Sequence, residues 1–268
     1  MLRKTAYYRF GLFRGAALIL AAAVGLLMAA PAGAAESETA GPLYYLNETA
    51  LNLVFEVREP LPIEGGTMVR RDGGQLNLPG GRIGAGDGMG GFGAVPFLTK
   101  VEPGRYPVAV FNKNYDDGDQ RTALAAVFFN DSRAVRWEMA VTSSKSDPSK
   151  LGRDDFFGYA VDSGTGCFIS LEAAAAYGRE VSKMSFFGGG LTGKLLKLFE
   201  EAHRAKDYAP IINFDIDPKK GLNMAAFSSG LGDGSYPSYF GYDAEGRVCC
   251  LVTDFLILED KPESENAD

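Results

Sequence analysis

The sequence predicts a β-rich α+β domain in which antiparallel sheets, forming a sandwich or a half-barrel, are accompanied by two helices. Short runs of β-branched and aromatic residues, each ended by turn residues, are the most frequent local pattern. In residues 135–142 the apolar Val135, Trp137 and Met139 alternate with polar side chains, as in a sheet with one solvated face. Strands outnumber helices without alternating regularly with them, which argues against a doubly wound parallel fold.

Further strands are expected at residues 53–58, 106–111, 122–129 and 248–258. The glycine-rich stretch 80–93 lacks the Lys-Ser/Thr ending of a phosphate-binding loop and the helix that should follow it. We therefore interpret it as a mobile surface loop.

Two helices interrupt the strands. Ser170 is expected to cap a helix over residues 171–177, with Gly178 as its stop. Thr192 is expected to cap a longer helix whose apolar face repeats at a spacing of three or four residues, through Leu195, Leu198, Phe199 and Ala202.

The N-terminus has the composition of a secretory signal peptide. Four cations precede an apolar run at residues 16–30, which is shorter than a membrane span, and an Ala-x-Ala exit follows at 32–34. We predict a signal peptide at residues 1–34, a flexible tail at 35–50, a single domain at 51–258 and a disordered acidic tail at 259–268. The leader looks bacterial, so the expected location is the periplasm or outside the cell, with no membrane span after cleavage.

The mature chain is strongly acidic. Removing the four leader cations changes the formal net charge from −7 to −11. Such a chain is repelled by phosphate backbones and anionic lipids, and its remaining cations are scattered among acids. Nucleic acid is therefore excluded as a partner.

The three cysteines, Cys167, Cys249 and Cys250, leave two interpretations open. In an oxidising compartment cysteines tend to pair. A bond between Cys249 and Cys250 would be strained, because neighbours on a strand point to opposite faces, so Cys167 is predicted to pair with one of them. The alternative is that all three are small buried apolar residues.

The single histidine, His203, lies among charged residues on the second predicted helix. A Ser-His-Asp or Cys-His nucleophile would need it in the site, and zinc sites favour several closely spaced His or Cys residues. Neither chemistry fits the sequence, so no cofactor is expected.

Acidic residues are the remaining candidates for catalytic or metal-binding side chains. Asp162 opens a Ser-Gly-Thr-Gly turn, Asp233 is bracketed by glycines, and Asp254 interrupts an apolar strand. Two adjacent carboxylates would serve general acid/base catalysis or bind calcium. Alternatively, Asp162 and Asp233 accept backbone hydrogen bonds within their own turns, and Asp254 pairs with Arg121 or Arg136.

Aromatic residues follow the Asp233 loop. Tyr236 and Tyr239 either form an aromatic wall for a ligand or cover a sheet face.

Several different sequence motifs follow one another along the chain. They lie at residues 78–83, 101–108, 137–140, 158–168, 229–236, 241–243 and 252–255, with Asp87 and Arg121 between them. Together they resemble the bacterial family known as domain of unknown function 4241, over roughly residues 76–258. The resemblance implies no activity. It does imply that the positions to test are Arg121, Trp137, Asp162, Asp233, Tyr236 and Asp254.

We interpret the protein as an exported, non-catalytic binding domain for a partner protein, as an inhibitor or immunity protein would be, or for a cell-envelope ligand. The expected binding residues are Arg121, Trp137, Asp162, Asp233, Tyr236 and Tyr239. The first alternative is a carboxylate hydrolase, with or without calcium, that uses Asp162, Asp233 and Asp254. The second is a structural envelope protein. In the first two interpretations the Asp162 and Asp233 bends must lie side by side and share one pocket.

Overall fold

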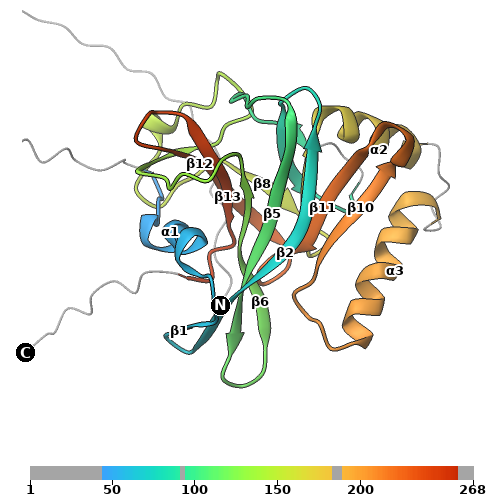
Figure 1. Cartoon of the computed structure of the whole chain (residues 1–268), viewed down its shortest axis with the longest axis horizontal. Helices are drawn as coiled ribbons and strands as arrows, with labels where there is room; N and C mark the ends of the chain where they lie inside the picture. The colour runs from blue at the N-terminus through green and yellow to red at the C-terminus, as the bar shows by residue number, and fades with distance from the viewer. Residues whose placement is uncertain (1–43, 91–93, 183–188, 259–268) are drawn as a thin grey trace, which may run out of the picture. The chain divides into compact units, whose positions relative to one another are not determined.

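The computed structural model describes residues 44–90, 94–182 and 189–258. The predicted signal peptide at 1–34 and the acidic tail at 259–268 lie outside these residues. The described chain forms two antiparallel sheets with helices on their outer sides (Figure 1). The predicted β-rich α+β class is confirmed, and the sheets are not closed into a barrel.

The larger sheet contains eight strands. In spatial order they are β1 (Leu61–Ile63), β2 (Gly66–Leu78), β5 (Gly104–Tyr115), β6 (Gln120–Phe128), β13 (Val248–Asp254), β12 (Gly234–Tyr242) and β7 (Arg136–Met139), with β8 (Gly158–Val161) also paired to β12. The strands expected at residues 106–111, 122–129 and 135–142 correspond to β5, β6 and β7, and that expected at 248–258 corresponds to β13.

The smaller sheet contains five strands. Their order is β10 (Ile211–Asp217), β11 (Leu222–Ser228), β9 (Thr165–Ser170), β3 (Ile83–Asp87) and β4 (Val95–Pro96). The helices are α1 (Glu48–Glu56), α2 (Leu171–Ser182) and α3 (Gly190–Arg204), and two short 3-10 helices cover Pro148–Lys150 and Pro218–Lys220.

Three apolar clusters hold these elements in four layers. One cluster lies between the two sheets and includes Val127 of β6 and Phe227 of β11. A second packs α1 onto the outer face of the larger sheet. The third packs α2 and α3 onto the outer face of the smaller sheet, where Leu195 of α3 is fully buried. Figure 1 shows α1 and α2–α3 at opposite ends of this arrangement.

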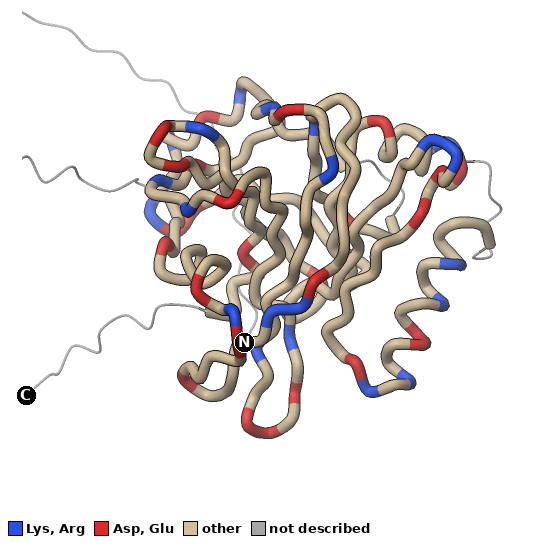
Figure 2. The backbone as a smooth tube through the Cα atoms, viewed as in Figure 1, with Lys and Arg blue, Asp and Glu red and all other residues tan. Residues whose placement is uncertain are grey.

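Charged residues are mixed in sign over the described chain, where Lys and Arg positions are interspersed with Asp and Glu positions (Figure 2). Within that part of the chain, none of the helices is long and apolar enough to cross a bilayer.

The strand predicted at residues 53–58 is wrong, because these residues belong mostly to α1. Leu51, Val54 and Phe55 are buried at the spacing of one helix face. Asn47 begins the helix by accepting a hydrogen bond from the Ala50 amide at 2.8 Å. The C-terminal boundary of the tail predicted at 35–50 is therefore wrong, because residues 44–50 already belong to the domain, where they contact its core or form its first helix.

The surface loop predicted at residues 80–93 is also wrong for residues 83–87, which form β3. This strand pairs with β9 on one side and β4 on the other. Glycine is needed for that packing, because a Cβ on Gly84 would lie 2.8 Å from the Val95 carbonyl oxygen.

The predicted helices exist with different ends. The Ser170 hydroxyl caps α2 as expected, accepting from the Ala173 amide at 3.0 Å, but the helix continues past Gly178 to Ser182. Thr192 does not cap α3, which begins at Gly190. One position of the alternating strand also differs, since Val135 precedes β7 and is 68% exposed.

Candidate binding cavity

A cavity of about 710 Å³ is lined by residues from both sheets. The smaller sheet contributes the end of β3, with Asp87, and Val95 of β4. The larger sheet contributes β8 and, from β12, Tyr236 and Ser238. Apolar and aromatic side chains therefore form most of the wall, and a few polar groups are set among them.

The cavity exists because two short strands share one edge of β12. β8 pairs with residues 234–237 of β12 and β7 with residues 239–242. The chain between them, residues 140–157, leaves the sheet, and Ala140, Thr142, Ser146 and Phe157 line the cavity. Small residues on the strands, including Ala85 and Ala160, leave the volume unfilled.

Asp87 is the most highly coordinated acid of the lining. Its Oδ1 accepts hydrogen bonds from the amides of Met89 and Gly90, both at 2.8 Å, and from the Ser163 hydroxyl at 2.7 Å. Its Oδ2 accepts from the amides of Asp162 at 2.8 Å and Ser163 at 2.9 Å. Burial by itself would raise the pKa of Asp87, but these hydrogen bonds together hold it below its ordinary value.

The two bends that the sequence singles out lie side by side. The turn between β8 and β9 contains Asp162 and Gly164, whose φ is 66°. The Gly164 carbonyl accepts a hydrogen bond from the Ser229 amide at 3.1 Å, which joins this turn to the loop before β12. Asp162 lines the cavity, whereas Asp233 is exposed and does not belong to the lining.

Tyr236 and Tyr159 form an aromatic part of the wall, with their ring centroids 6.4 Å apart. The Tyr236 hydroxyl donates to the Gly232 carbonyl at 2.8 Å, so this side chain braces the Asp233 loop. The buried Tyr159 hydroxyl has no hydrogen-bond partner of acceptable geometry among the described residues. Burial raises the pKa of Tyr159, and the nearby Thr253 hydroxyl lowers it by less.

One lining residue of the cavity also belongs to a pair of hydroxyl groups. Ser238, which lines the cavity, lies 2.8 Å from the Thr253 hydroxyl of β13, and either oxygen can be the donor. Both side chains are buried, so this pair satisfies its polar atoms internally.

The other predicted binding residues lie elsewhere. Trp137 and Tyr239 are buried in the cluster on the α1 side of the larger sheet. Their polar atoms are used there, because the Trp137 indole donates to Asn52 at 3.3 Å and the Tyr239 hydroxyl to the Tyr45 carbonyl at 2.6 Å. Arg121 forms an ion pair with Asp119 beside the β5–β6 hairpin. None of the three residues lines the cavity.

Asp254 is 1% exposed and also lies outside the cavity lining. It accepts a hydrogen bond from the Tyr45 hydroxyl at 3.1 Å and from the Leu256 amide at 2.8 Å. Arg121 and Arg136, its predicted ion-pair partners, bond to Asp119 and Glu138. The three acids of the hydrolase interpretation are therefore not gathered in this cavity.

Comparison with known families identifies the chain. The model of the family described as "Protein of unknown function (DUF4241)" matches residues 76–253, about two thirds of the sequence. The chain belongs to this family. No curated protein and no solved structure gives a significant match.

The DUF4241 match begins within β2 and ends within β13. It therefore contains the whole cavity lining, while α1 and β1 precede it. The cavity is a feature of the family region of this chain.

Sequence reasoning about this DUF4241 chain missed Asp87 as a site residue, because the surrounding glycines were interpreted as a loop. The signal was an acid directly after the apolar, small-residue run at 83–86, where a strand end can present it to a neighbouring turn. Among the described residues, no group of three or more His, Cys, Asp or Glu side chains is placed to hold a metal ion.

The predicted disulfide of Cys167 with Cys249 or Cys250 is wrong, because the cysteines lie in different layers. Cys167 packs under α2 and α3, whereas Cys249 and Cys250 pack in the cluster on the α1 side, and all three are free. Cys249 and Cys250 share a face because a register shift opposite Gly241 and Tyr242 leaves Cys249 unpaired in the ladder. Their sulfurs are 3.9 Å apart.

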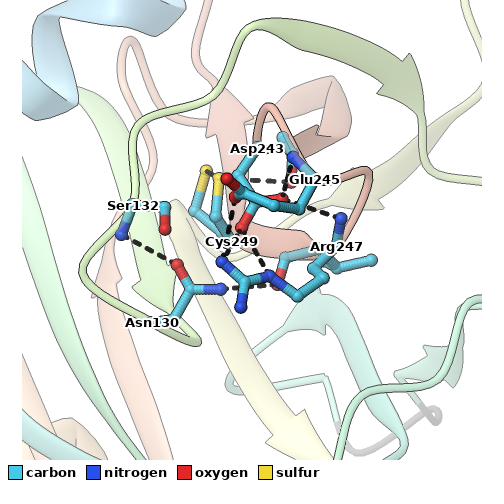
Figure 3. Close-up of polar contacts among 9 residues, drawn as sticks. Asn130, Ser132, Asp243, Glu245, Arg247 and Cys249 are labelled. Atoms are coloured by element: carbon cyan, nitrogen blue, oxygen red, sulfur yellow. Dashed lines mark hydrogen bonds and ion pairs between the residues drawn. The ribbon is translucent and has the colours of Figure 1, made fainter.

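A polar cluster fixes the turn beside these thiols (Figure 3). The buried Asp243 carboxylate accepts from the amide of Arg247 at 2.8 Å and from its Nε at 2.9 Å. Burial would raise the pKa of Asp243, but the bonds from Arg247 and the Glu245 amide lower it. The Cys250 thiol lowers the pKa of Cys249, whereas burial raises that of Cys250.

Proposed function

We propose that this protein is an exported binding domain that holds a small, largely apolar ligand in the cavity between its sheets, without covalent chemistry. The observation that carries this proposal is the cavity itself. Its volume of about 710 Å³ falls in the range of small-molecule sites, roughly 300–1,000 Å³. Its wall combines aromatic and apolar side chains with a few placed polar groups, as such sites do.

The chemistry of the acids supports binding rather than hydrolysis. Both oxygens of Asp87 are occupied by internal donors, so this carboxylate serves the structure of the wall. Hydrolysis by paired carboxylates needs a second acid facing the same substrate, roughly 5–10 Å away. Neither Asp233 nor Asp254 lines the cavity with Asp162. A purely structural envelope protein would not require a ligand-sized cavity between its two sheets.

Blocking the cavity tests the proposal. Ala160 lies on β8, is exposed and lines the cavity, so Ala160→Trp should fill the opening without disturbing the core. The neutral fluorescent compound N-phenyl-1-naphthylamine should bind the wild-type protein saturably, with an emission increase, and should lose at least about tenfold in affinity in the variant, because the indole occupies its place.

The matched control is Ala175→Trp, an exposed alanine on α2 outside the lining. It should bind the compound as the wild type does, and circular dichroism should show both variants folded. Equal binding by Ala160→Trp and Ala175→Trp, or no saturable binding by the wild type, would contradict the proposal.

A further inference from the structure

The acids and aromatic rings of the cavity are arranged in a way that defines the charge of its ligand. The described lining contains two carboxylates, Asp87 and Asp162, and no lysine, arginine or histidine. We infer that the cavity selects molecules with an apolar body and a positively charged amino group. This inference rests on the proposed binding function and adds the chemical class of the ligand.

The charge of Asp87 is stabilised by dipoles and not by a cation. All five of its hydrogen-bond donors, four backbone amides and the Ser163 hydroxyl, are neutral groups. These bonds keep the carboxylate ionised at neutral pH, consistent with its lowered pKa. A half-buried negative charge without a counter-cation makes the cavity potential negative, and the surrounding apolar wall weakens solvent screening.

Asp162 supplies the carboxylate that a ligand can contact. Its backbone amide is used by Asp87, but its exposed side chain makes no hydrogen bond or ion pair with the described residues. Because Asp162 lines the cavity, its oxygens are available to an ammonium group entering there. The two acids therefore have different roles. Asp87 fixes the turn and contributes a negative electrostatic potential, whereas Asp162 provides carboxylate oxygens that can accept hydrogen bonds from the ligand.

The aromatic wall suits the same ligand. Tyr159, Tyr236, Phe97 and Phe157 line the cavity, where their rings provide contact area for an apolar body. Ring faces also attract cations, so the aromatic wall and the carboxylates favour a ligand of the same charge. An anion would meet two like charges without a compensating base and would lose its hydration as well.

Three compounds that share one ring system measure this selectivity. 2-Naphthylmethylamine carries a cation at neutral pH, 2-naphthylmethanol is neutral, and 2-naphthoate is an anion. Measured by isothermal titration calorimetry on the full chain, affinity should fall in that order, with the amine bound about fivefold more tightly than the alcohol. The preference should shrink at high salt, because the contact at Asp162 is exposed.

Two substitutions locate the effect. Asp162→Asn should bring the affinity for the amine towards that of the alcohol. Asp233→Asn removes the same charge from the adjoining loop, outside the lining, and should leave the preference unchanged. Thermal unfolding should show that both variants remain folded.

The possible results separate this inference from the proposed function. Binding of all three compounds with equal affinity, or equal effects of the two substitutions, overturns the inference while the binding function stands. Failure of the wild-type protein to bind any of the three overturns both. An ordered preference that Asp162→Asn alone reduces supports both.

Discussion

The carboxylate of Asp87 joins segments that are about 75 residues apart in the sequence, since it bonds to Ser163 and to the amide of Asp162. Each oxygen is satisfied by groups that point at it from a turn, an arrangement that favours the ionised form over the protonated one. A single residue thus aligns the end of β3 with the β8–β9 turn, and so positions Asp162 at the cavity.

Asp87→Asn should reduce the free energy of unfolding by about 2–3 kcal/mol at pH 7, because the amide group would face backbone donors and the charge-assisted bonds would be lost. Since the folded-state pKa is lowered, the stabilisation is present above the unfolded value of about 3.9 and is lost as the pH falls through the folded-state pKa. Urea unfolding at pH 7 and at pH 3 should show that the difference between wild type and variant is smaller at pH 3 than at pH 7.

The control for this measurement is Asp233→Asn, which changes an exposed carboxylate in the neighbouring loop. Its unfolding free energy should stay within about 0.5 kcal/mol of the wild type at both pH values. A pH-independent deficit in Asp87→Asn would mean that lost packing, and not lost ionisation, causes the destabilisation.

At the scale of single elements, the sequence predicted which segments are strands better than it predicted what covers them. The alternation through Trp137 and Met139 correctly indicated a buried face on β7. It could not indicate that this face contacts α1 instead of the cavity, because alternation assigns residues to faces and says nothing of the layer opposite. Asp162 was expected at the site from its turn chemistry and Tyr236 from its position directly after the Asp233 loop, and both residues line the cavity.

The helix α1 was missed for a related reason. Its β-branched and aromatic residues, Val54 and Phe55, favour a strand locally, whereas the cap at Asn47 and the spacing of Leu51, Val54 and Phe55 indicate a helix. Asn47 also donates from Nδ2 to the Leu258 carbonyl at 2.7 Å, which ties the helix start to the end of the domain.

Asn47→Ala should therefore lower the free energy of unfolding by about 2–3 kcal/mol, because the helix loses its cap and a partly buried carbonyl loses its donor. Asn47→Ser keeps an acceptor for the Ala50 amide but is too short to reach Leu258, so about half of the loss should remain. Chemical denaturation of the three proteins gives these values. Identical losses in the two variants would show that the cap contributes nothing.

At the scale of the whole molecule, the four layers decide the state of the cysteines. The sequence predicted a link from Cys167 to the Cys249–Cys250 pair because it contains three thiols and the composition expected of a signal peptide, yet the order of the layers cannot be inferred from the spacing of cysteines. The cluster between the two sheets separates the partners, so no ordinary Cα–Cα distance for a disulfide is reachable without unfolding.

Protein purified without reductant and then denatured should therefore give three thiols per chain with a chromogenic disulfide reagent. The native protein should react slowly, because all three residues are buried. A value of one thiol after denaturation would show that a bridge forms; peptide mapping that finds Cys167 in it would mean that the layers rearrange, whereas a bridge between Cys249 and Cys250 would leave them in place. The triple Cys→Ser variant, which should give no signal, serves as the blank.

The shared edge of β12 has a consequence for how the wall of the cavity can be altered. Residues 140–157 lie between two strands that pair with the same edge of β12, and the ladder pairs of β7 and β8 do not include them, although the Ala140 amide still donates to the Ser238 carbonyl at 2.7 Å. An exchange of that segment for one of another length or composition would reshape one wall of the cavity while leaving the ladder pairs in place. Grafting it between members of the family should transfer ligand preference from one to the other.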